Sequence, residues 1–439
     1  MKKRGVYWWL LICFFKSVRV LKKIESPAMF PLTSFIMFSS TSIVVLLLLI
    51  SFTQAAILPD STLGLTEIAW SFEPAQIYLG SPSILRLSNG DILASADRFG
   101  SGFQTRRNAS IYLSTDDGAT WTFQSWVLDQ YWSNLFQLNV TSNDVYLLGT
   151  ATDGPAPLKI SKSTDQGKSW KQTTTIHGGI KSNQSYETGP TPALIHNGVV
   201  YRAVERLAPP FRWGTDYQAV VMYANVSSNL LDADSWTISK SLPFNLSWIP
   251  TDWSPQPQTP GYLEGNMVVG PDGGIVNVLR FNTRPYSGNK AIILRFDSAS
   301  NQFQFDSIVT LPGGHTKFVI RQDSKTGMYV TLSNPNTIPN ATDQRNILAL
   351  CTSTDLRTWK ERKVLLNDDT GFSLNMLDSV KYTGFHYVDW QFDGKEDIIM
   401  AVRTAYRGAV SYHNSNRLTY KKILNWRSLR RDAVVEKEL

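Results

Sequence analysis

The chain has 439 residues, of which 42% are hydrophobic and 12% aromatic, which is enough for one large domain with a substantial core. The formal net charge is +7, but residues 1–56 hold seven basic residues and one acidic residue, so the rest of the chain carries only +1. A nearly neutral body excludes a dominant basic surface for DNA or RNA, and we expect no nucleic-acid partner.

The first 56 residues have the pattern of a targeting leader. An apolar stretch from about residue 35 to residue 52 ends in the small residues Thr53-Gln54-Ala55-Ala56, which resemble a signal-peptidase site. The earlier apolar run, Tyr7–Phe15, is too short to cross a bilayer. We therefore expect either a cleaved signal peptide and a secreted protein, or an uncleaved signal-anchor that keeps the domain on the lumenal or extracellular side of a membrane.

Asn-x-Ser/Thr sequons agree with passage through a secretory compartment and predict a glycoprotein. They lie at Asn108, Asn139, Asn183, Asn225, Asn245 and Asn340. Of the two cysteines, Cys13 lies in the leader, so a mature chain would keep Cys351 alone and could form no internal disulfide. The apolar run before Cys351 predicts a buried structural thiol rather than a nucleophile.

After the leader, pairs of short apolar runs are joined by turns rich in Gly, Asn and Asp, which predicts antiparallel hairpins. In chain order these hairpins lie at 83–96, 135–149, 193–204, 266–279, 318–332 and 387–402. A third strand is expected after each hairpin, at 110–113, 158–160, 219–223, 291–296, 346–350 and 409–412. The units follow one another at roughly 50–75 residues, so the sequence predicts a repeat protein.

A turn of the pattern Ser-x-Asp-x-Gly-x-Thr/Ser-Trp follows the third strand of several units. Full copies occupy Ser114–Trp121 and Ser163–Trp170, and weaker copies occupy 353–359 and 232–236. The Asp can accept hydrogen bonds from the backbone of its own turn, the Gly supplies an unusual backbone angle, and the Trp anchors the turn by burial. These properties favour a structural turn, known as an Asp box, over a metal site.

Six units of four antiparallel strands predict an all-β fold, a six-bladed β-propeller of about residues 65–430, followed by a polar tail at 431–439. A β-sandwich is the alternative, but it would not require the repeated Asp boxes. In a propeller the Asp boxes lie at one face, which we call the bottom face. The inner strands then begin at the opposite face, the top face, and converge on the central axis.

The top face is where we expect the chemistry. The polar residues predicted there are Ser81, Asp97, Arg98, Asp153, Thr191, Glu205, Arg206, Glu264, Arg280, His315, Lys317, Asn334, Arg345, Tyr387 and Arg403. Arginines, carboxylates and a tyrosine that converge suit an anionic sugar, because a guanidinium can bind a carboxylate through two parallel hydrogen bonds.

The Asp boxes and the six-unit repeat resemble the sialidase (neuraminidase) superfamily, and the resemblance covers nearly all of residues 65–430. It implies roles for individual residues. Glu264, which precedes a hairpin ending at Arg280, matches a catalytic Glu and a carboxylate-binding Arg of that family. Arg345, at the start of a strand before an Asp box, matches a second arginine. Tyr387 matches the tyrosine nucleophile, and sialidases are an exception to the two-carboxylate rule of glycosidases.

Two departures from the family pattern bear on the substrate. Gly80, in Leu79-Gly80-Ser81-Pro82, stands where the family has its first arginine, and the loop 99–108 lacks the expected acid. Asp97 is the nearest candidate for that acid. Arg98, Arg106 or Arg403 could replace the missing arginine. These departures argue against hydrolysis of common sialic acid and favour another acidic sugar.

We therefore expect a secreted, exo-acting glycoside hydrolase for an acidic sugar terminus, with Tyr387 as nucleophile, Glu264 as its base and Asp97 as acid. Substrate contacts are expected from Arg280, Arg345, Arg98, Glu205, His315 and Arg403. We expect an acidic glycan as partner, a monomer, and no metal or cofactor. A polysaccharide lyase that uses His315, Tyr387 and Arg345 is one alternative. A non-catalytic propeller that binds glycans or proteins is the other.

Overall fold

The computed structural model describes residues 62–71, 75–102, 108–139, 141–154, 156–170, 172–176, 185–370 and 376–430. The chain separates into two compact units, Met1–Gln54 and Ala55–Leu439, and every described residue belongs to the second unit. The predicted leader at 1–56 and the predicted tail at 431–439 lie outside the described residues. The fold below is therefore that of the second unit alone.

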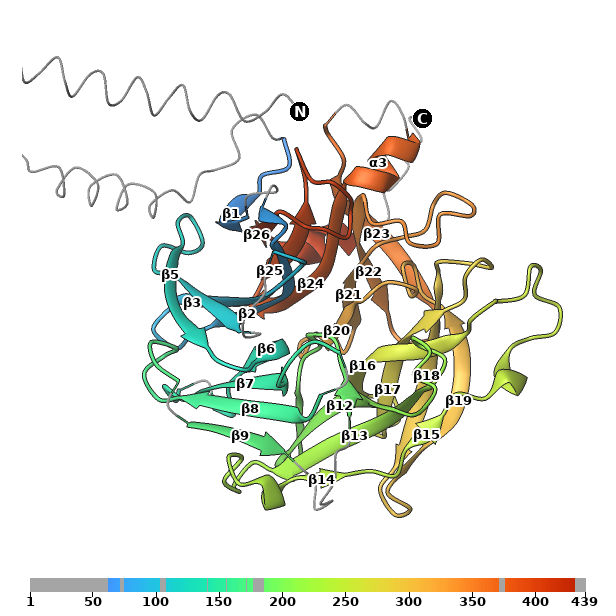
Figure 1. Ribbon diagram of the computed structural model, residues 1–439, viewed down its shortest axis with the longest axis horizontal. Helices are drawn as coiled ribbons and strands as arrows, with labels where there is room; N and C mark the ends of the chain where they lie inside the picture. The colour runs from blue at the N-terminus through green and yellow to red at the C-terminus, as the bar shows by residue number, and fades with distance from the viewer. Residues whose placement is uncertain are drawn as a thin grey trace, which may run out of the picture. The chain divides into compact units, whose positions relative to one another are not determined.

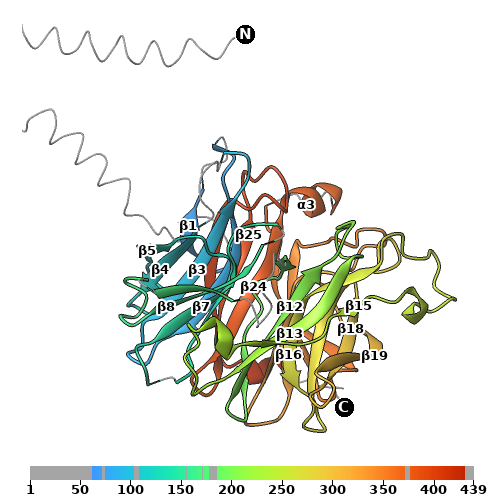
Figure 2. The same cartoon turned by 60° about the horizontal axis from the view of Figure 1, so that its bottom comes forward.

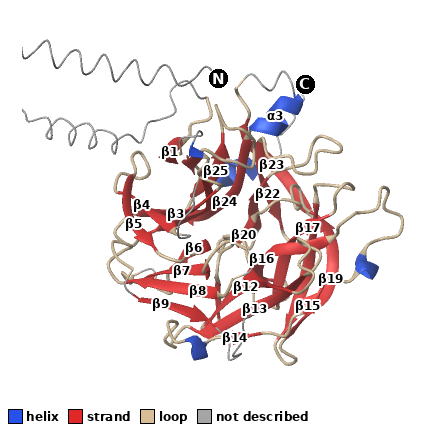
Figure 3. Cartoon of the chain, in the orientation of Figure 1, coloured by secondary structure: helices blue, strands red, loops and turns tan. Residues whose placement is uncertain are grey.

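Antiparallel sheets follow one another around a common centre, as Figure 1 shows by the progression of colour along the chain. Strands dominate the described part and helices are short (Figure 3). Each sheet is one blade, and the blades are numbered 1 to 6 in the chain order of their innermost strands. The prediction of a six-bladed propeller with four-stranded blades is confirmed, although blade 3 divides its inner and outer strands into two pieces each.

The strand bounds are as follows. Blade 1 holds β2 (Tyr78–Arg86), β3 (Ile92–Phe99), β4 (Ala109–Ser114) and β5 (Thr122–Val127); blade 2 holds β6 (Tyr131–Phe136), β7 (Val145–Thr150), β8 (Leu158–Ser163) and β9 (Gln172–Ile176). Blade 3 holds β10 (Tyr186–Glu187), β11 (Leu194–His196), β12 (Val199–Leu207), β13 (Tyr217–Asn225), β14 (Thr237–Ile238) and β15 (Leu242–Pro243). Blade 4 holds β16 (Gly261–Val269), β17 (Ile275–Asn282), β18 (Lys290–Asp297) and β19 (Gln302–Thr310). Blade 5 holds β20 (Val319–Gln322), β21 (Tyr329–Ser333), β22 (Ile347–Ser353) and β23 (Trp359–Asn367). Blade 6 holds β24 (Gly384–Asp393), β25 (Asp397–Ala405), β26 (Arg417–Ile423) and β1 (Thr66–Trp70), and the helix α3 (Met376–Tyr382) precedes it.

Blade 6 joins the two ends of the described chain. Its outer strand is β1, which pairs antiparallel with β26 and lies with the last blade in both views (Figures 1 and 2). The third strand expected at 409–412 is wrong, because that segment is a loop and β26 takes its place. The backbone turns there through positive φ angles at Arg407 and Gly408, which ends β25 before the chain returns. Pairing of the first strand with the last closes the ring.

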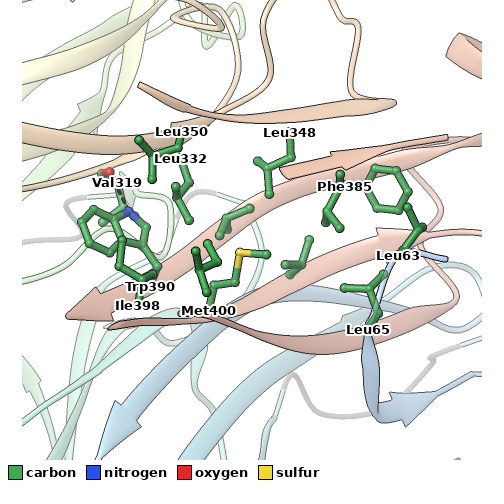
Figure 4. Packing of buried hydrophobic residues seen from close by; sticks show 14 of the residues in the cluster. Leu63, Leu65, Val319, Leu332, Leu348, Leu350, Phe385, Trp390, Ile398 and Met400 are labelled. Carbon is green, nitrogen blue, oxygen red and sulfur yellow. Dashed lines mark hydrogen bonds between the residues drawn. The ribbon is translucent and has the colours of Figure 1, made fainter. Parts of the chain in front are cut away.

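Among the described residues, an apolar core fills the junction between each pair of neighbouring blades. Figure 4 shows the core between blades 5 and 6, where Leu332 and Leu348 face Trp390 and Met400. Trp390 is fully buried and donates its indole N–H to the carbonyl of Val319 at 3.0 Å. Such a contact satisfies the polar edge of the indole while its large apolar face packs between the blades. The blades therefore support one another around the ring.

The Ser-x-Asp turns are closed by their own side chains. In the first copy, Asp116 Oδ1 accepts hydrogen bonds from Ser114 Oγ and from the backbone N–H of Thr120, both at 2.8 Å. In the second copy, Asp165 Oδ1 accepts the corresponding bonds from Ser163 Oγ at 2.7 Å and from the N–H of residue 169 at 2.9 Å. The turn itself uses these carboxylates, which agrees with a structural role.

The glycine of the first copy also has a packing role. Gly118 has a φ of 88°, and a Cβ added there would lie 2.1 Å from Cε1 of Tyr420 in blade 6. Trp121 packs against the same tyrosine, with ring centroids 5.5 Å apart. This turn therefore anchors blade 1 to blade 6 at the place where the ring closes.

Further features of the described residues bear on the sequence predictions. Cys351 is fully buried and unpaired, as predicted, and burial raises the pKa of its thiol to about 12. Asn139, Asn225, Asn245 and Asn340 are exposed, whereas Asn183 lies outside the described residues. In the part of the chain that the structure describes, no helix has the length and hydropathy needed to span a bilayer.

Candidate active site

Bulges at matching positions of four innermost strands build the site. Pairing with the second strand shifts register between Gly80 and Ser83, Tyr131 and Asn134, Leu263 and Asn266, and His386 and Asp389. The bulged residue is in the left-handed region each time, with φ of 44° at Ser81, 45° at Trp132, 54° at Glu264 and 53° at Tyr387. Such angles cost a non-glycine residue about 1–3 kcal/mol each, so the surrounding structure must hold them. Bulges of this kind re-aim side chains.

Tyr387, Glu264 and Arg280 form a closed, buried hydrogen-bonded group. The hydroxyl of Tyr387 donates to Glu264 Oε1 at 2.5 Å. Arg280 Nη1 donates to Glu264 Oε2 at 2.9 Å and to the Tyr387 hydroxyl at 3.3 Å, and its Nε donates to the carbonyl of His315 at 2.5 Å. Burial and the charge of Glu264 raise the pKa of Tyr387 to about 12. Tyr387 can therefore become a nucleophile near neutral pH only if Glu264 takes its proton.

Two further guanidinium groups lie over the ring of Tyr387. Arg345 is 5.6 Å and Arg403 is 5.0 Å from its centroid, and the two residues are only 4% and 6% exposed. Arg345 Nη1 lies 2.7 Å from His386 Nδ1, and Arg403 Nη2 donates to the carbonyl of His413 at 2.5 Å. Among the described residues neither forms an ion pair with a carboxylate. Burial lowers the pKa of both groups, because a buried cation without a counter-ion is costly.

The cavity around Tyr387 has two lobes. The arginine lobe, of about 370 Å³, is lined by Arg280, Arg284, His315 and Arg345. The acid lobe, of about 560 Å³, is lined by Asp97, Asp153, Glu187 and Glu264 together with Arg403. Tyr387, Trp213 and His413 line both lobes. The Tyr387 hydroxyl thus lies where a cationic wall meets an acidic one, and the combined space is of the size of small-molecule sites.

Two carboxyl groups of the acid lobe can carry a proton near neutral pH. Burial raises the pKa of Asp97 to about 6, although Asp97 Oδ2 accepts the backbone N–H of Trp132 at 2.9 Å. Burial, assisted by the charge of Glu264, raises the pKa of Glu187 to about 7. The hydroxyl of Tyr217 donates to Glu187. Each of these groups has the protonation behaviour that a general acid needs.

Gly80, where the sequence comparison with sialidases expects an arginine, packs closely against Asp97 and Phe99. A Cβ at this position would lie 2.5 Å from Asp97 Oδ1 and 3.2 Å from the ring of Phe99. A cation is nevertheless present at this side, because the guanidinium of Arg403 lies 4.5 Å from the centroid of the Phe99 ring. A side chain at position 80 would therefore require Asp97 or Phe99 to shift.

The structure separates the predicted site residues into two groups. Tyr387, Glu264, Asp97, Arg280, Arg345, His315 and Arg403 line the cavity. Arg98 and Glu205 line neither lobe. Arg98 points the other way from Asp97 along β3, and its guanidinium lies 4.9 Å from the ring of Trp126 on the outer strand β5. Glu205 is fully buried beside the backbone of β16.

His315 belongs to the wall of the arginine lobe. Its Nε2 lies 3.0 Å from Asp343 Oδ1, and it is 1% exposed. Burial and the charges of Arg280 and Arg345 hold its pKa well below the usual value. A neutral imidazole that is hydrogen-bonded to Asp343 can orient a ligand. Its low pKa makes it a weak base for a lyase reaction.

Sequence reasoning missed several residues of the cavity, among them Glu187 and Trp213. Glu187 pairs with Glu205 across the inner hairpin of blade 3 and precedes Gly189-Pro190, much as Leu79-Gly80 precedes Ser81-Pro82 in blade 1. Trp213 lies on the 208–216 loop, is 46% exposed, and has the guanidinium of Arg280 5.2 Å from its ring. No repeat pattern marks that loop.

Within the described ranges, no cluster of three or more His, Cys, Asp or Glu side chains is arranged to hold a metal ion. The groups that surround Tyr387 are cations and carboxyls that bond to protein partners. The arrangement can bind an anion, activate a tyrosine hydroxyl and supply a proton.

No family model and no curated protein matches this sequence. Solved structures do match its fold. An α-L-arabinanase of Penicillium chrysogenum, solved with arabinobiose, is 15% identical, with a TM-score of 0.52 over 82% of this chain and 98% of the arabinanase. The Hadza microbial sialidase Hz136 is 12% identical, with a TM-score of 0.54 over 82% of this chain and 68% of the sialidase.

A third match is the α-L-arabinofuranosidase Arb93A of Fusarium graminearum, solved as a point mutant in complex with an iminosugar inhibitor. It is 13% identical, with a TM-score of 0.53 over 81% of this chain and 94% of the enzyme. Identities this low establish the fold and leave the reaction open. The chain has the sialidase-like six-bladed propeller fold, which it shares with glycoside hydrolases that include sialidases and arabinan-degrading enzymes.

Proposed function

We propose that this protein is a glycoside hydrolase that releases a terminal sugar carrying a carboxylate. The observation that supports it most directly is the pair of buried guanidinium groups of Arg345 and Arg403, which flank Tyr387 without a carboxylate partner among the described residues. With Arg280 they place three cations around one tyrosine, against the single paired carboxylate of Glu264. A substrate carboxylate would supply the missing negative charge.

The first step would be attack by Tyr387 on the anomeric carbon. Glu264 Oε1, 2.5 Å from the hydroxyl, accepts the proton as the oxygen–carbon bond forms. The glycosidic bond breaks at the same time, and a carboxylic acid in the acid lobe gives its proton to the departing oxygen. A tyrosine suits this substrate class, because the neutral hydroxyl approaches an anionic sugar with less repulsion than a carboxylate would meet.

The second step would release the sugar. Water attacks the anomeric carbon of the glycosyl-tyrosine, and the acid-lobe carboxylate, now deprotonated, accepts its proton. The phenolate of Tyr387 leaves and recovers its proton from Glu264. Both steps invert the anomeric centre, so the proposal entails net retention of configuration.

A specific observation favours a second candidate, a hydrolase for neutral glycosides that uses two carboxylates. Glu187 and Glu264 line the same lobe, and the charge of Glu264 contributes to the raised pKa of Glu187. In this scheme Glu264 is the nucleophile, Glu187 is the acid, and Tyr387 orients Glu264 by its hydrogen bond. Arabinan-degrading enzymes with the same fold make α-L-arabinofuranosides the natural neutral substrates to test.

A panel of glycosides separates the two candidates. The full-length protein would be incubated with 4-methylumbelliferyl glycosides of sialic, keto-deoxy and uronic acids and of α-L-arabinofuranose, and with uronate polysaccharides monitored in the ultraviolet. We expect release from an acidic glycoside. In Arg345→Met, kcat/KM on that glycoside should fall on the order of 100-fold, since each tenfold corresponds to about 1.4 kcal/mol of lost binding.

Each other outcome has a defined meaning. Hydrolysis of the arabinofuranoside that survives Arg345→Met would replace the proposal by the two-carboxylate candidate. An unsaturated product that absorbs in the ultraviolet would indicate the lyase, and glycan binding without turnover would indicate a non-catalytic propeller. Arg280→Ala is the less informative variant, because Arg280 also holds Glu264 and Tyr387 and should reduce activity on every glycoside.

We also propose that the domain is a secreted or lumenal glycoprotein. The apolar leader and the exposed positions of several sequons support this. Expression in a secretory host, followed by treatment with a peptide N-glycosidase, should lower the apparent mass. An unchanged mass would oppose glycosylation.

A further inference from the structure

Two buried ionisable side chains contact the backbone of the bulges from which Tyr387 and Glu264 project. Lys317 and Glu205 are 1% and 0% exposed, and neither lines a lobe of the cavity. A substrate in the cavity therefore has no direct access to them. Burial of an ionisable group is costly, so the burial of both Lys317 and Glu205 next to these bulges requires a physical reason.

Lys317 bonds to the Tyr387 bulge. Its ammonium donates to the carbonyl of Val388 at 2.8 Å and lies 3.4 Å from the carbonyl of Tyr387. The residue belongs to blade 5, whereas Tyr387 belongs to blade 6. Among the described residues Lys317 has no ion-pair partner, and burial lowers its pKa to about 7. Its hydrogen bonds go to the backbone of this one bulge.

Glu205 bonds to the Glu264 bulge in the opposite sense. Its Oε1 accepts the backbone N–H of Gly265 at 3.3 Å, and its Oε2 is buried without a partner. Glu205 lies on β12 of blade 3 and Glu264 lies on β16 of blade 4. Lys317 thus donates to carbonyl groups of the Tyr387 bulge, and Glu205 accepts an N–H group of the Glu264 bulge. Each residue belongs to the blade that precedes the bulge it contacts.

The backbone at both bulges needs such support. Glu264 and Tyr387 have φ angles of 54° and 53°, which non-glycine residues adopt only where their surroundings over-determine them. A small rotation at either residue would displace its side chain, and the contact between the two side chains depends on a separation of 2.5 Å. Bonds to the backbone at the bulge oppose that rotation most directly.

We propose that Lys317 and Glu205 are positioning residues, which hold the two left-handed bulges so that Tyr387 and Glu264 stay in hydrogen-bond contact. The assignment of a catalytic consequence to this contact rests on the proposed function. The positioning itself does not, and it can be measured in the absence of any substrate.

The primary test is spectroscopic. The full-length protein would be labelled with tyrosine carrying ¹³C at Cζ, and the signal of Tyr387 would be assigned by its loss in Tyr387→Phe. Lys317→Met and Glu205→Leu should shift that signal, because the hydrogen bond from the phenol to Glu264 weakens. Glu205→Gln should leave it nearly in place, since the amide oxygen still accepts the backbone N–H of Gly265. If Lys317→Met does not fold, the two Glu205 variants carry the test.

Matched controls come from the closure of blade 6. Lys421 donates to the backbone carbonyl of Leu63, and Glu67 pairs with Arg417 at 3.1 Å. Lys421→Met and Glu67→Gln remove comparable interactions at a distance from the cavity and should not move the Tyr387 signal. A signal that is unchanged in both Lys317→Met and Glu205→Leu, or that moves equally in the controls, overturns the proposal.

Kinetics supply the second readout. On a glycoside that the wild type hydrolyses, Lys317→Met and Glu205→Leu should lower kcat on the order of 100-fold, as expected for a misplacement of about 1 Å, and should leave KM nearly unchanged. If kcat/KM of these variants falls because KM rises while kcat stays unchanged, the two residues act in substrate binding and the positioning role is refuted. A wild type without hydrolytic activity refutes the proposed function alone, because the spectroscopic result stands independently of it.

Discussion

The hydroxyl of Tyr387 lies 2.5 Å from Glu264 Oε1, although 123 positions separate the two residues in the chain. Both stand at the same place in their blades, on the left-handed residue of a bulge in the innermost strand. Tyr387 and Glu264 come into contact because the innermost strands of the propeller converge on one axis. Substitutions at this pair and around it give the following predictions.

Tyr387→Phe should lower kcat by roughly 1000-fold or more on the glycoside that the protein cleaves, since it removes the nucleophilic oxygen. Glu264→Gln should cost on the order of 100- to 10,000-fold, the usual range for loss of a general base. In the two-carboxylate scheme the order reverses, because Glu264 would be the nucleophile and Tyr387 only its hydrogen-bond donor. Steady-state kinetics of the two variants on one substrate decide between these orders.

The pH dependence of kcat/KM should identify the proton donor. The acid must carry its proton, so activity is retained below its pKa and is lost as the pH rises through it. This alkaline limb should lie near pH 7 if the donor is Glu187 and near pH 6 if it is Asp97. Glu187→Gln and Asp97→Asn should each be profiled, and the limb should vanish only in the variant of the true donor.

The leaving group gives an internal control for that assignment. Substrates with an acidic leaving group, such as 4-methylumbelliferone, need little protonation and should lose less activity in the donor variant than a natural sugar leaving group. Equal losses on both substrates would mean that the substituted carboxyl acts in binding or positioning rather than as the acid.

Glu205→Gln should change how stability depends on pH. Burial raises the pKa of Glu205 to about 8 from an unfolded value near 4.5, so the folded state holds this proton more tightly than the unfolded state does. The stability from this group is fully present below about pH 4.5 and is lost progressively as the pH rises to about 8. Relative to the wild type, Glu205→Gln should become more stable with rising pH across this window, as denaturant unfolding at several pH values would show. A constant difference would contradict the shift.

Gly118→Ala should destabilise the ring closure. A Cβ there meets Cε1 of Tyr420 at 2.1 Å, and the φ of 88° is strained for alanine, so we expect a loss of about 1–3 kcal/mol or more. Gly167→Ala in the second turn is the matched control: its φ is 82°, but its Cβ would lie 3.0 Å from the flexible end of Leu93. Denaturant unfolding should show the larger loss for Gly118→Ala, while kinetics remain close to the wild type. Equal losses would show that strain, rather than the contact with Tyr420, decides the cost.

The repeated turns made the fold predictable. A carboxylate such as Asp116 caps its own turn, and a glycine such as Gly118 permits its backbone, so these signals act within a single turn and are visible in the sequence. The hairpins of all six blades were placed correctly for the same reason. The third strand expected at 409–412 was wrong and the closing strand β1 was not predicted, because neither β26 nor β1 has a local turn signal and their pairing spans the whole domain.

The site was predictable only where a side chain lies on the innermost strand of a blade or near the end of the second strand. Glu264, Arg280 and Tyr387 were found in this way. Glu187 was missed because β10 is only two residues long, and Trp213 because its loop has no repeat counterpart. Arg98 and Asp97 were both predicted to face the cavity, although consecutive residues of a strand point to opposite faces. That alternation sends Arg98 to Trp126 instead.

The sequence by itself determined the number of blades and the positions of the Ser-x-Asp turns, because both follow from local patterns repeated along the chain. The roles given to Tyr387, Glu264, Arg280 and Arg345 come from the resemblance to sialidases and stay predictions. Only the tertiary structure decided that Arg403 stands beside Tyr387 and that a Cβ at position 80 would meet Asp97 and Phe99. It also decided that Glu187 shares a lobe with Glu264 and that Lys317 and Glu205 hold the bulges from behind. Each of these relationships joins residues of different blades or depends on burial by several of them. The distances between these residues and the shifts of their pKa values therefore follow from the convergence of the inner strands, and no local sequence pattern encodes them.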